Sequence, residues 1–157
     1  MSTLDNSPVL ICYDRSEDSR RAIVVAGSLF TGREAIILHV WTPVAVIAAA
    51  YGGMVSLPSY DDHELQKAAL VLSEEGTRIA TDAGLVAKAE ITQSTHEGTS
   101  RTILTFADER DAALIVTGAR GLSAFKSFVL GSVSHGVVQH AHRPVLVVPP
   151  PTATAAS

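Results

Sequence analysis

The chain contains a single cysteine, Cys12, among its 157 residues. One thiol cannot form an internal disulfide, so a disulfide framework is excluded as a source of stability. Cys12 lies inside the apolar run VLICY, which favours a small buried side chain in a reducing compartment. We therefore expect a cytoplasmic protein, and the chain length suits one compact domain with a sizeable core.

The sequence also lacks a surplus of positive charge. It has 12 Lys and Arg against 16 Asp and Glu, a net charge of -4, with both signs scattered along the chain. No basic patch is available to displace counterions from a nucleic-acid backbone, so we do not expect a nucleic-acid partner. The N-terminus has no basic region, carries Asp5 early and has too short an apolar run for a signal peptide, so we expect no export.

Charged residues are missing altogether from residues 36–60. A segment of that length is long enough to span a bilayer. However, Pro43, the pair Gly52 and Gly53, and Pro58 interrupt it, and its beginning is β-branched like a strand. We predict a buried strand followed by an apolar surface loop over residues 44–57, with no membrane partner. Whether this loop covers a ligand or meets a partner subunit stays open at this point.

Apolar runs and helical patterns alternate along the rest of the chain. The spacing predicts strands over residues 8–14, 34–41, 86–93, 111–118 and 143–149, and helices over residues 17–30, 61–83, 99–109 and 132–141. Glycines at 32 and 84 fall just past two of the helices, where a left-handed cap is favoured. The fold class is therefore α/β: one doubly wound, five-stranded parallel sheet, ordered 3-2-1-4-5, with helices on both faces. We assign residues 1–149 to this domain and residues 150–157 to a disordered tail.

A glycine-rich stretch, TGARGLSAFKSFVLGSVS, runs from Thr117 to Ser134. It follows the fourth predicted strand, while Asp14 follows the first. If these strands are neighbours where the strand order reverses, both features face one crevice. Gly118 and Gly121 would let backbone N–H groups approach a bulky anion and would permit positive φ, and Gly131 with Ser132 begins a helix whose first N–H groups favour phosphate.

Other side chains near this stretch extend the prediction. Arg120 would add charge-assisted hydrogen bonds to phosphate oxygens, and Ser123 and Lys126 lie between the glycines. The stretch is neither a Walker A motif, since no glycine precedes a lysine, nor a dinucleotide fingerprint, since no two glycines flank a single residue. Taken alone, such glycines are also compatible with ordinary turns.

The full spacing, Gly118-x2-Gly121-x9-Gly131-Ser132, closely resembles the nucleotide-binding signature of the universal stress protein family. The likeness covers most of the chain, from the first strand with Asp14 and Ser16 to the closing PVLVV. It implies an ATP-binding module, with Mg²⁺ accompanying the phosphates. Asp14 would lie near the ribose and Val40 would give backbone contacts to adenine. The matching phosphate-loop positions are Gly118, Arg120, Gly121, Gly131, Ser132 and Val133, with Cys12, Ser16, Thr117, Ser123 and Lys126 as further candidates.

The resemblance also implies a homodimer paired through the last strand, residues 143–149, which would cover an apolar edge. One departure from the family pattern stands out, because the chain has Asp14-Arg15-Ser16 where Asp-Gly-Ser is common. Arg15 would sit outside the crevice, contact the phosphates or narrow the site, and the sequence leaves these three alternatives open.

Catalytic and metal-binding patterns are weak. The histidines His140 and His142 lie five and seven residues after His135. On a helix these spacings give no compact chelating pair, so we predict no metal site of the protein's own. We find no base near the predicted phosphates and no nucleophile elbow. We expect a dimeric regulatory module of the stress response that acts through a protein partner. The alternatives are a weak ATPase or nucleotidyl-transfer enzyme, and a dimeric scaffold whose site is empty or holds another adenine nucleotide such as cyclic AMP.

Overall fold

The structure is a computed structural model that describes residues 6–53, 61–121 and 129–151. Its strands are β1 (Val9–Cys12), β2 (Glu34–Trp41), β3 (Val86–Gln93), β4 (Leu114–Gly118) and β5 (Val145–Val148). They form one parallel sheet in the order β3-β2-β1-β4-β5. The predicted α/β fold and strand order are thus confirmed.

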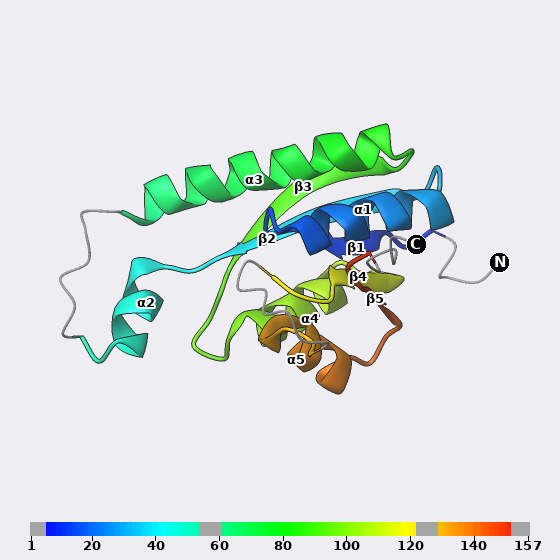
Figure 1. Cartoon of the computed structure of the whole chain (residues 1–157). Coiled ribbons are helices and arrows are strands. Elements are labelled where there is room, and N and C mark those ends of the chain that lie inside the picture. The colour runs from blue at the N-terminus through cyan, green and yellow to red at the C-terminus, as the bar shows by residue number, and fades with distance from the viewer. Residues whose placement is uncertain (1–5, 54–60, 122–128, 152–157) are drawn as a thin grey trace, which may run out of the picture.

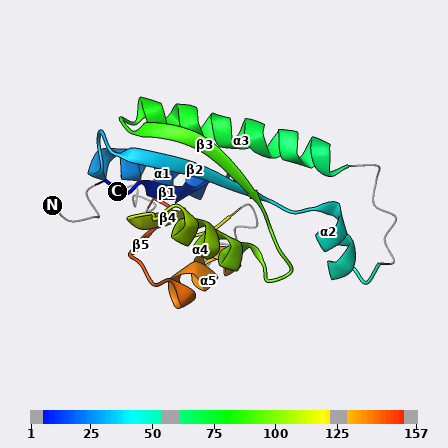
Figure 2. The same cartoon turned by 180° about the vertical axis from the view of Figure 1, so that it is seen from behind.

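The helices lie on both faces of this sheet. One face carries α1 (Glu17–Leu29) and α3 (Asp62–Asp82), and the other carries α4 (Thr99–Glu109) and α5 (Ser132–His140), as Figure 1 shows. This arrangement follows from right-handed crossovers between parallel strands. The helix α2 (Val44–Ala50) stands apart from both layers, beyond the carboxyl end of β2 (Figure 2).

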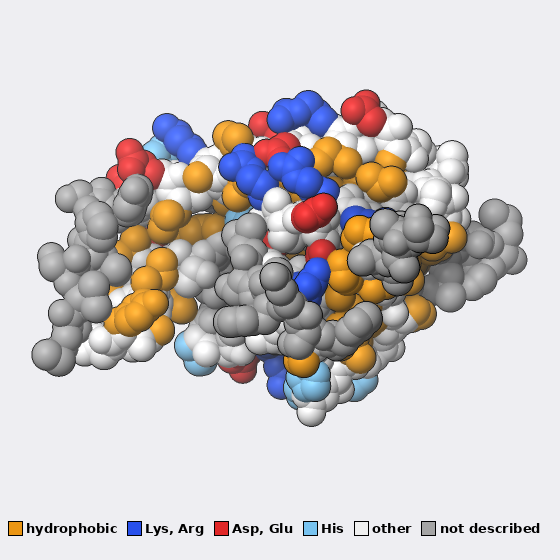
Figure 3. Space-filling view, viewed as in Figure 1, with side chains coloured by type: hydrophobic (Ala, Val, Ile, Leu, Met, Phe, Trp, Pro, Cys, Tyr) orange, Lys and Arg blue, Asp and Glu red, His pale blue; other side chains and the backbone are white. Residues whose placement is uncertain are grey.

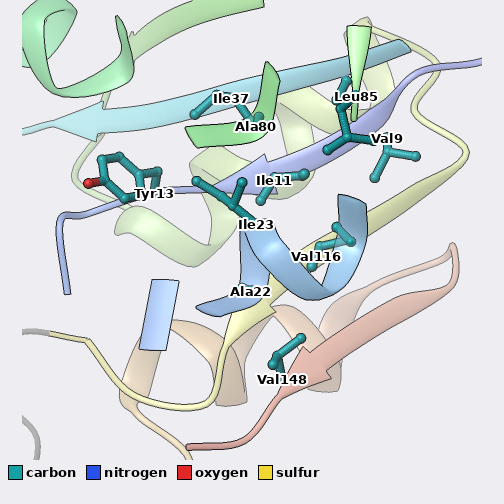
Figure 4. Packing of buried hydrophobic residues seen from close by; sticks show 12 residues of the cluster. Val9, Ile11, Tyr13, Ala22, Ile23, Ile37, Ala80, Leu85, Val116 and Val148 are labelled. Carbon is teal, nitrogen blue, oxygen red and sulfur yellow. The ribbon is translucent and has the colours of Figure 1, made fainter. Parts of the chain in front are cut away.

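Alternating side chains of the strands fill two cores. Val9 and Ile11 of β1 are fully buried against α1 and α3, where Ile23 and Ala80 meet them (Figure 4). Leu10, between them in the sequence, points to the opposite core, with residues of α4 and α5. Because a central parallel strand is buried on both faces, its sequence is a continuous apolar run. This is why VLIC was recognisable as a strand.

Helix ends agree with the sequence signals. The side chain of Ser16 caps α1 by accepting a hydrogen bond from the N–H of Ser19 at 3.2 Å. Gly32 and Gly84 have φ values of +79° and +97°, the left-handed conformation predicted after α1 and α3. The strands β1, β4 and β5 are shorter than predicted, mainly because their predicted ranges included the adjoining turns.

The predicted apolar loop after β2 is partly wrong, because residues 44–50 form the helix α2. The run VAVIAAA is rich in alanine, the strongest helix former, and the following Gly52 and Gly53 have positive φ and end it. None of the residues of α2 is buried, and hydrophobic side chains are visible over it in Figure 3. Residues 54–57 of the predicted loop lie outside the described residues.

The membrane question raised by residues 36–60 has a structural answer for the described part of the chain. No helix there is both long and apolar enough to cross a bilayer. Most of the predicted tail, residues 152–157, lies outside the described residues.

Candidate functional site

A crevice of about 610 Å³ opens at the carboxyl ends of β1, β2 and β4. At this edge the chain leaves β1 for α1 on one face, and leaves the neighbouring β4 toward α5 on the other (Figure 1). This is the switch point at which open parallel sheets bind ligands, and the volume is in the range of small-molecule sites.

Most of the predicted site residues line this crevice. They are Cys12, Asp14, Val40, Thr117, Gly118, Arg120, Gly121, Gly131, Ser132 and Val133. Two of the further candidates, Ser123 and Lys126, lie outside the described residues. Ser16 is not among the lining residues, and its side chain caps α1.

The two ends of the glycine-rich stretch are held together. The N–H of Gly131 donates to the carbonyl of Ala119 at 2.8 Å, so the start of α5 lies against the residues that follow β4. Gly131 is the N-cap of α5 and offers no side-chain acceptor to the first turn. Since Ser132, Val133 and Ser134 line the crevice, the positive end of the helix dipole lies at it, a favourable place for an anion.

Gly118 and Gly121 serve close packing rather than positive φ. None of Gly118, Gly121 and Gly131 has a left-handed φ, which corrects that part of the prediction. A Cβ on Gly118 would lie 2.7 Å from the backbone carbon of Asp18, and one on Gly121 would lie 2.8 Å from Oδ2 of Asp14. Gly118 therefore allows β4 to pack against α1, while Gly121 brings the loop backbone to the Asp14 carboxylate.

Asp14 is positioned by the turn between β1 and α1. Its Oδ1 accepts a hydrogen bond from the N–H of Ser16 at 2.9 Å. The carboxylate thus lies between the start of α1 and Gly121, where it lines the crevice. The expectation that Asp14 and the glycine-rich stretch face one crevice is met.

Arg15 does not line the crevice. Its φ is +68°, an uncommon conformation for a residue with a Cβ. Its guanidinium instead donates from Nε and Nη2 to Oε2 of Glu75 on α3, at 3.0 and 2.6 Å. Of the three places left open for Arg15, the structure shows the one outside the crevice.

Glu75 is the centre of a small polar cluster. Besides Arg15, it accepts hydrogen bonds at Oε1 from the hydroxyl of Tyr13 at 2.6 Å and from Nη2 of Arg20 at 2.5 Å. The hydrogen bonds from Tyr13 and Arg15 lower the pKa of Glu75 to about 2. Basic and acidic side chains accordingly lie side by side on the face shown in Figure 3, instead of forming a patch of one sign.

The end of the crevice next to β2 is apolar. Leu38, Val40 and Ile103 line it together with Cys12. Burial, and secondarily the charge of Asp14, raises the pKa of the Cys12 thiol to about 12. The thiol is therefore a protonated, weakly polar wall of the crevice at neutral pH.

Several lining residues were not foreseen from the sequence. His39 bonds through Nδ1 to the carbonyl of Tyr13 at 2.8 Å, which fixes the proton on Nδ1 because a carbonyl only accepts. Ser134 donates to the carbonyl of Gly118 at 2.6 Å and ties α5 to β4. The serine at the third position of α5 was visible in the quoted stretch, but its inward direction was not. The remaining unforeseen lining residues are Tyr13, Ser19, Leu38, Thr99, Ile103, Val129 and Leu130.

The described residues contain no group of three or more His, Cys, Asp or Glu side chains placed to hold a metal ion. His140 bonds instead to the carbonyl of Gly136, one turn back in α5.

Comparison with known proteins identifies the family. Residues 6–149 match the model of the universal stress protein family. The chain is also 34% identical over 148 residues to the universal stress protein YxiE of Bacillus subtilis, an alignment that covers 89% of this chain and 97% of the relative. The chain therefore belongs to the universal stress protein family.

Solved structures share the fold. The universal stress protein of Archaeoglobus fulgidus in complex with dAMP aligns with a TM-score of 0.64 at 22% identity, covering 92% of this chain and 98% of that protein. A universal stress protein in complex with cAMP aligns with a TM-score of 0.67 at 22% identity, covering 92% and 97%.

Proposed function

We propose that this protein is a regulatory module that binds ATP in the crevice. The observation that carries the proposal is the hydrogen bond from Gly131 to Ala119, which brings the N-terminus of α5 to the end of β4 beside Asp14. A helix N-terminus, close backbone approach and an apolar end within one crevice are the elements that an adenine nucleotide needs.

The geometry suggests how the ligand would lie. The adenine ring suits the apolar end at Leu38, Val40 and Ile103, and the ribose hydroxyls suit the carboxylate of Asp14. The phosphates would then reach Gly121 and the first turn of α5. Mg²⁺ would be held mainly by phosphate oxygens and water, because magnesium binds substrate phosphates more readily than all-protein cages.

Relatives support an adenine nucleotide as the ligand class. One structure of the family holds dAMP and another holds cAMP. The choice of ATP rests on the Gly118-x2-Gly121-x9-Gly131-Ser132 spacing, which resembles the signature of the ATP-binding branch. A titration with ATP, ADP, AMP and cAMP would therefore rank ATP first.

The test has two parts. Freshly purified protein is denatured and any released nucleotide is identified by chromatography, and nucleotide-free protein is then titrated calorimetrically with ATP and Mg²⁺. We expect released adenine nucleotide or micromolar affinity, roughly -8 kcal/mol of binding free energy, that is lost in Gly131→Val. Absence of both released nucleotide and heat of binding would refute the proposal.

The module is proposed to work as a cytoplasmic homodimer. The strand β5 is an edge of the sheet, and its Val145, Leu146 and Val147 remain partly exposed in one chain. Pairing of β5 with a second copy would cover these side chains and the unpaired backbone of the edge. Light scattering on a sizing column should give the mass of a dimer, and Leu146→Lys should shift it to that of a monomer. A monomeric wild type would contradict this part of the proposal.

A further inference from the structure

The carboxylate of Asp18 connects α1 to the beginning of the glycine-rich stretch. Its Oδ2 accepts a hydrogen bond from the backbone N–H of Arg120 and a second from Nε of the same residue, both at 3.1 Å. The two residues are 102 positions apart in the sequence. A single carboxylate oxygen thus fixes both the main chain and the side-chain direction of Arg120.

This contact is well shielded from water. The side chain of Asp18 is only 8% exposed and that of Arg120 is 22% exposed. Hydrogen bonds to a charged acceptor are stronger than neutral ones, and they strengthen further where water is excluded. The close approach of Gly118 to the backbone of Asp18 adds a steric constraint two residues before Arg120. Asp18 therefore constrains both Arg120, through its carboxylate, and the end of β4 just before Arg120, through its backbone.

We propose that Asp18 is a positioning residue of the nucleotide site, which aligns Arg120 and the adjoining Gly121 with the phosphates. This inference rests on the proposed function. Arg120 and Gly121 line the crevice, whereas Asp18 does not, so Asp18 acts through Arg120. Arg120 enters the site with its Nε already committed to Asp18, and the remainder of its guanidinium is oriented by that bond.

Whether substitution of Asp18 raises or lowers the affinity for ATP distinguishes a positioning role from a purely electrostatic one. Removing a negative charge near bound phosphates should strengthen ATP binding if charge alone matters, because like charges repel. Removing an aligning acceptor should weaken binding, because the loop would then have to be ordered when the ligand binds. The two accounts therefore predict opposite changes for the same substitution.

The experiment compares three variants by calorimetry with ATP and with adenosine. Asp18→Ala removes both charge and acceptor, and Asp18→Asn removes only the charge. Glu17→Gln is the matched control, since Glu17 lies in the same first turn of α1 and is exposed. We expect Asp18→Ala to weaken ATP binding by about tenfold, Asp18→Asn to recover part of that loss, and Glu17→Gln to bind like the wild type. Adenosine affinity should stay within about twofold in all three, because the lost contact concerns the phosphates.

Unchanged or tighter ATP binding in Asp18→Ala would overturn the inference, as would an equal loss for ATP and adenosine. Hydrogen exchange of the Arg120 amide gives a readout that needs no ligand. We expect protection of this amide to fall in Asp18→Ala and to persist in Glu17→Gln, and unchanged protection in Asp18→Ala would also overturn the inference. If the wild type binds neither ligand, the proposed function fails, while the exchange data still decide whether Asp18 orders Arg120.

Discussion

Arg15 and Glu75 form a two-point ion pair, with Nε and Nη2 of Arg15 donating to one carboxylate oxygen of Glu75. The pair joins the turn after β1 to the middle of α3. It directs a long basic side chain out of the crevice at the position where glycine is common in the family. The bulk and charge of Arg15 are thereby kept away from the space proposed for the nucleotide.

The positive φ of Arg15 predicts an order of stability for two variants. Arg15→Gly should be more stable than Arg15→Ala by about 1 kcal/mol, because glycine adopts a φ of +68° without strain and alanine does not. Loss of the ion pair is common to both and should cost less than about 1 kcal/mol, since the Arg15 side chain is 52% exposed. Urea unfolding measures the difference, and equal stability of the two variants would show that φ at this position relaxes.

The cluster around Glu75 predicts a pH dependence. The pKa of Glu75 falls from 4.5 to about 2 in the folded chain, so the folded state favours the carboxylate. Its contribution to stability is complete above pH 4.5 and is lost as the pH falls from there toward 2. The stability advantage of the wild type over Glu75→Gln should shrink across that window in urea unfolding. The exposed neighbour Glu74, changed to Gln, is the control, and a pH-independent advantage of the wild type over Glu75→Gln would contradict the assignment.

Two glycines at the crevice should respond differently to alanine. Gly118→Ala should lower the free energy of unfolding by about 2 kcal/mol, because its Cβ would overlap the backbone of Asp18. Gly131→Ala should change stability by less than about 1 kcal/mol, because its φ is -59° and its Cβ meets only ordinary contacts at 3.5 Å and beyond.

The Gly131→Ala variant also separates an effect on ATP binding from an effect on folding. The Cβ added at Gly131 would lie next to the backbone from Ala119 to Gly121, where the phosphates are proposed to approach. Gly131→Ala should therefore lose about tenfold in ATP affinity, or about 1.4 kcal/mol, while its thermal unfolding stays near that of the wild type. Full ATP affinity in a folded Gly131→Ala protein would remove this glycine from the site.

Cys12 should be chemically inert in the folded protein. With a thiol pKa of about 12 against 9.0, the reactive thiolate is depleted by roughly a thousandfold at neutral pH. Alkylation by iodoacetamide, followed by mass spectrometry, should be at least about tenfold slower than that of the denatured chain, the remaining rate reflecting local opening. Alkylation at the denatured-state rate would contradict the raised pKa of this thiol.

The sequence predicted the features that depend on local pattern. Apolar runs such as VLIC and LIVT identified buried parallel strands, and Gly32 and Gly84 marked helix ends, because these signals reflect the backbone conformation of a few neighbouring residues. The placement of Asp14 and the glycine-rich stretch at one crevice followed from the strand order. Helix α2 was missed, because a short alanine-rich run between Pro43 and a glycine pair reads equally well as a loop.

Contacts between residues far apart in the sequence could not be predicted from local sequence pattern. The bond from Arg120 to Asp18 depends on how α1 packs against the end of β4, and the partner of Arg15 lies 60 residues away on α3. The direction of Arg15 also depends on its positive φ, which nothing in the tripeptide Asp14-Arg15-Ser16 signals. Side-chain direction at turns is set by tertiary packing, so the choice among the three places for Arg15 required the structure.

The central claim is that ATP occupies this crevice with its phosphates at the start of α5. It is tested most directly by titrating ¹⁵N-labelled, nucleotide-free protein with ATP and Mg²⁺ and following the backbone amide signals by NMR. The account predicts saturable shifts that are largest for Gly121, Gly131, Ser132 and Val133, with smaller shifts at Cys12 and Val40. Saturating ATP that moves none of these amides, or moves mainly amides far from the crevice, would contradict it.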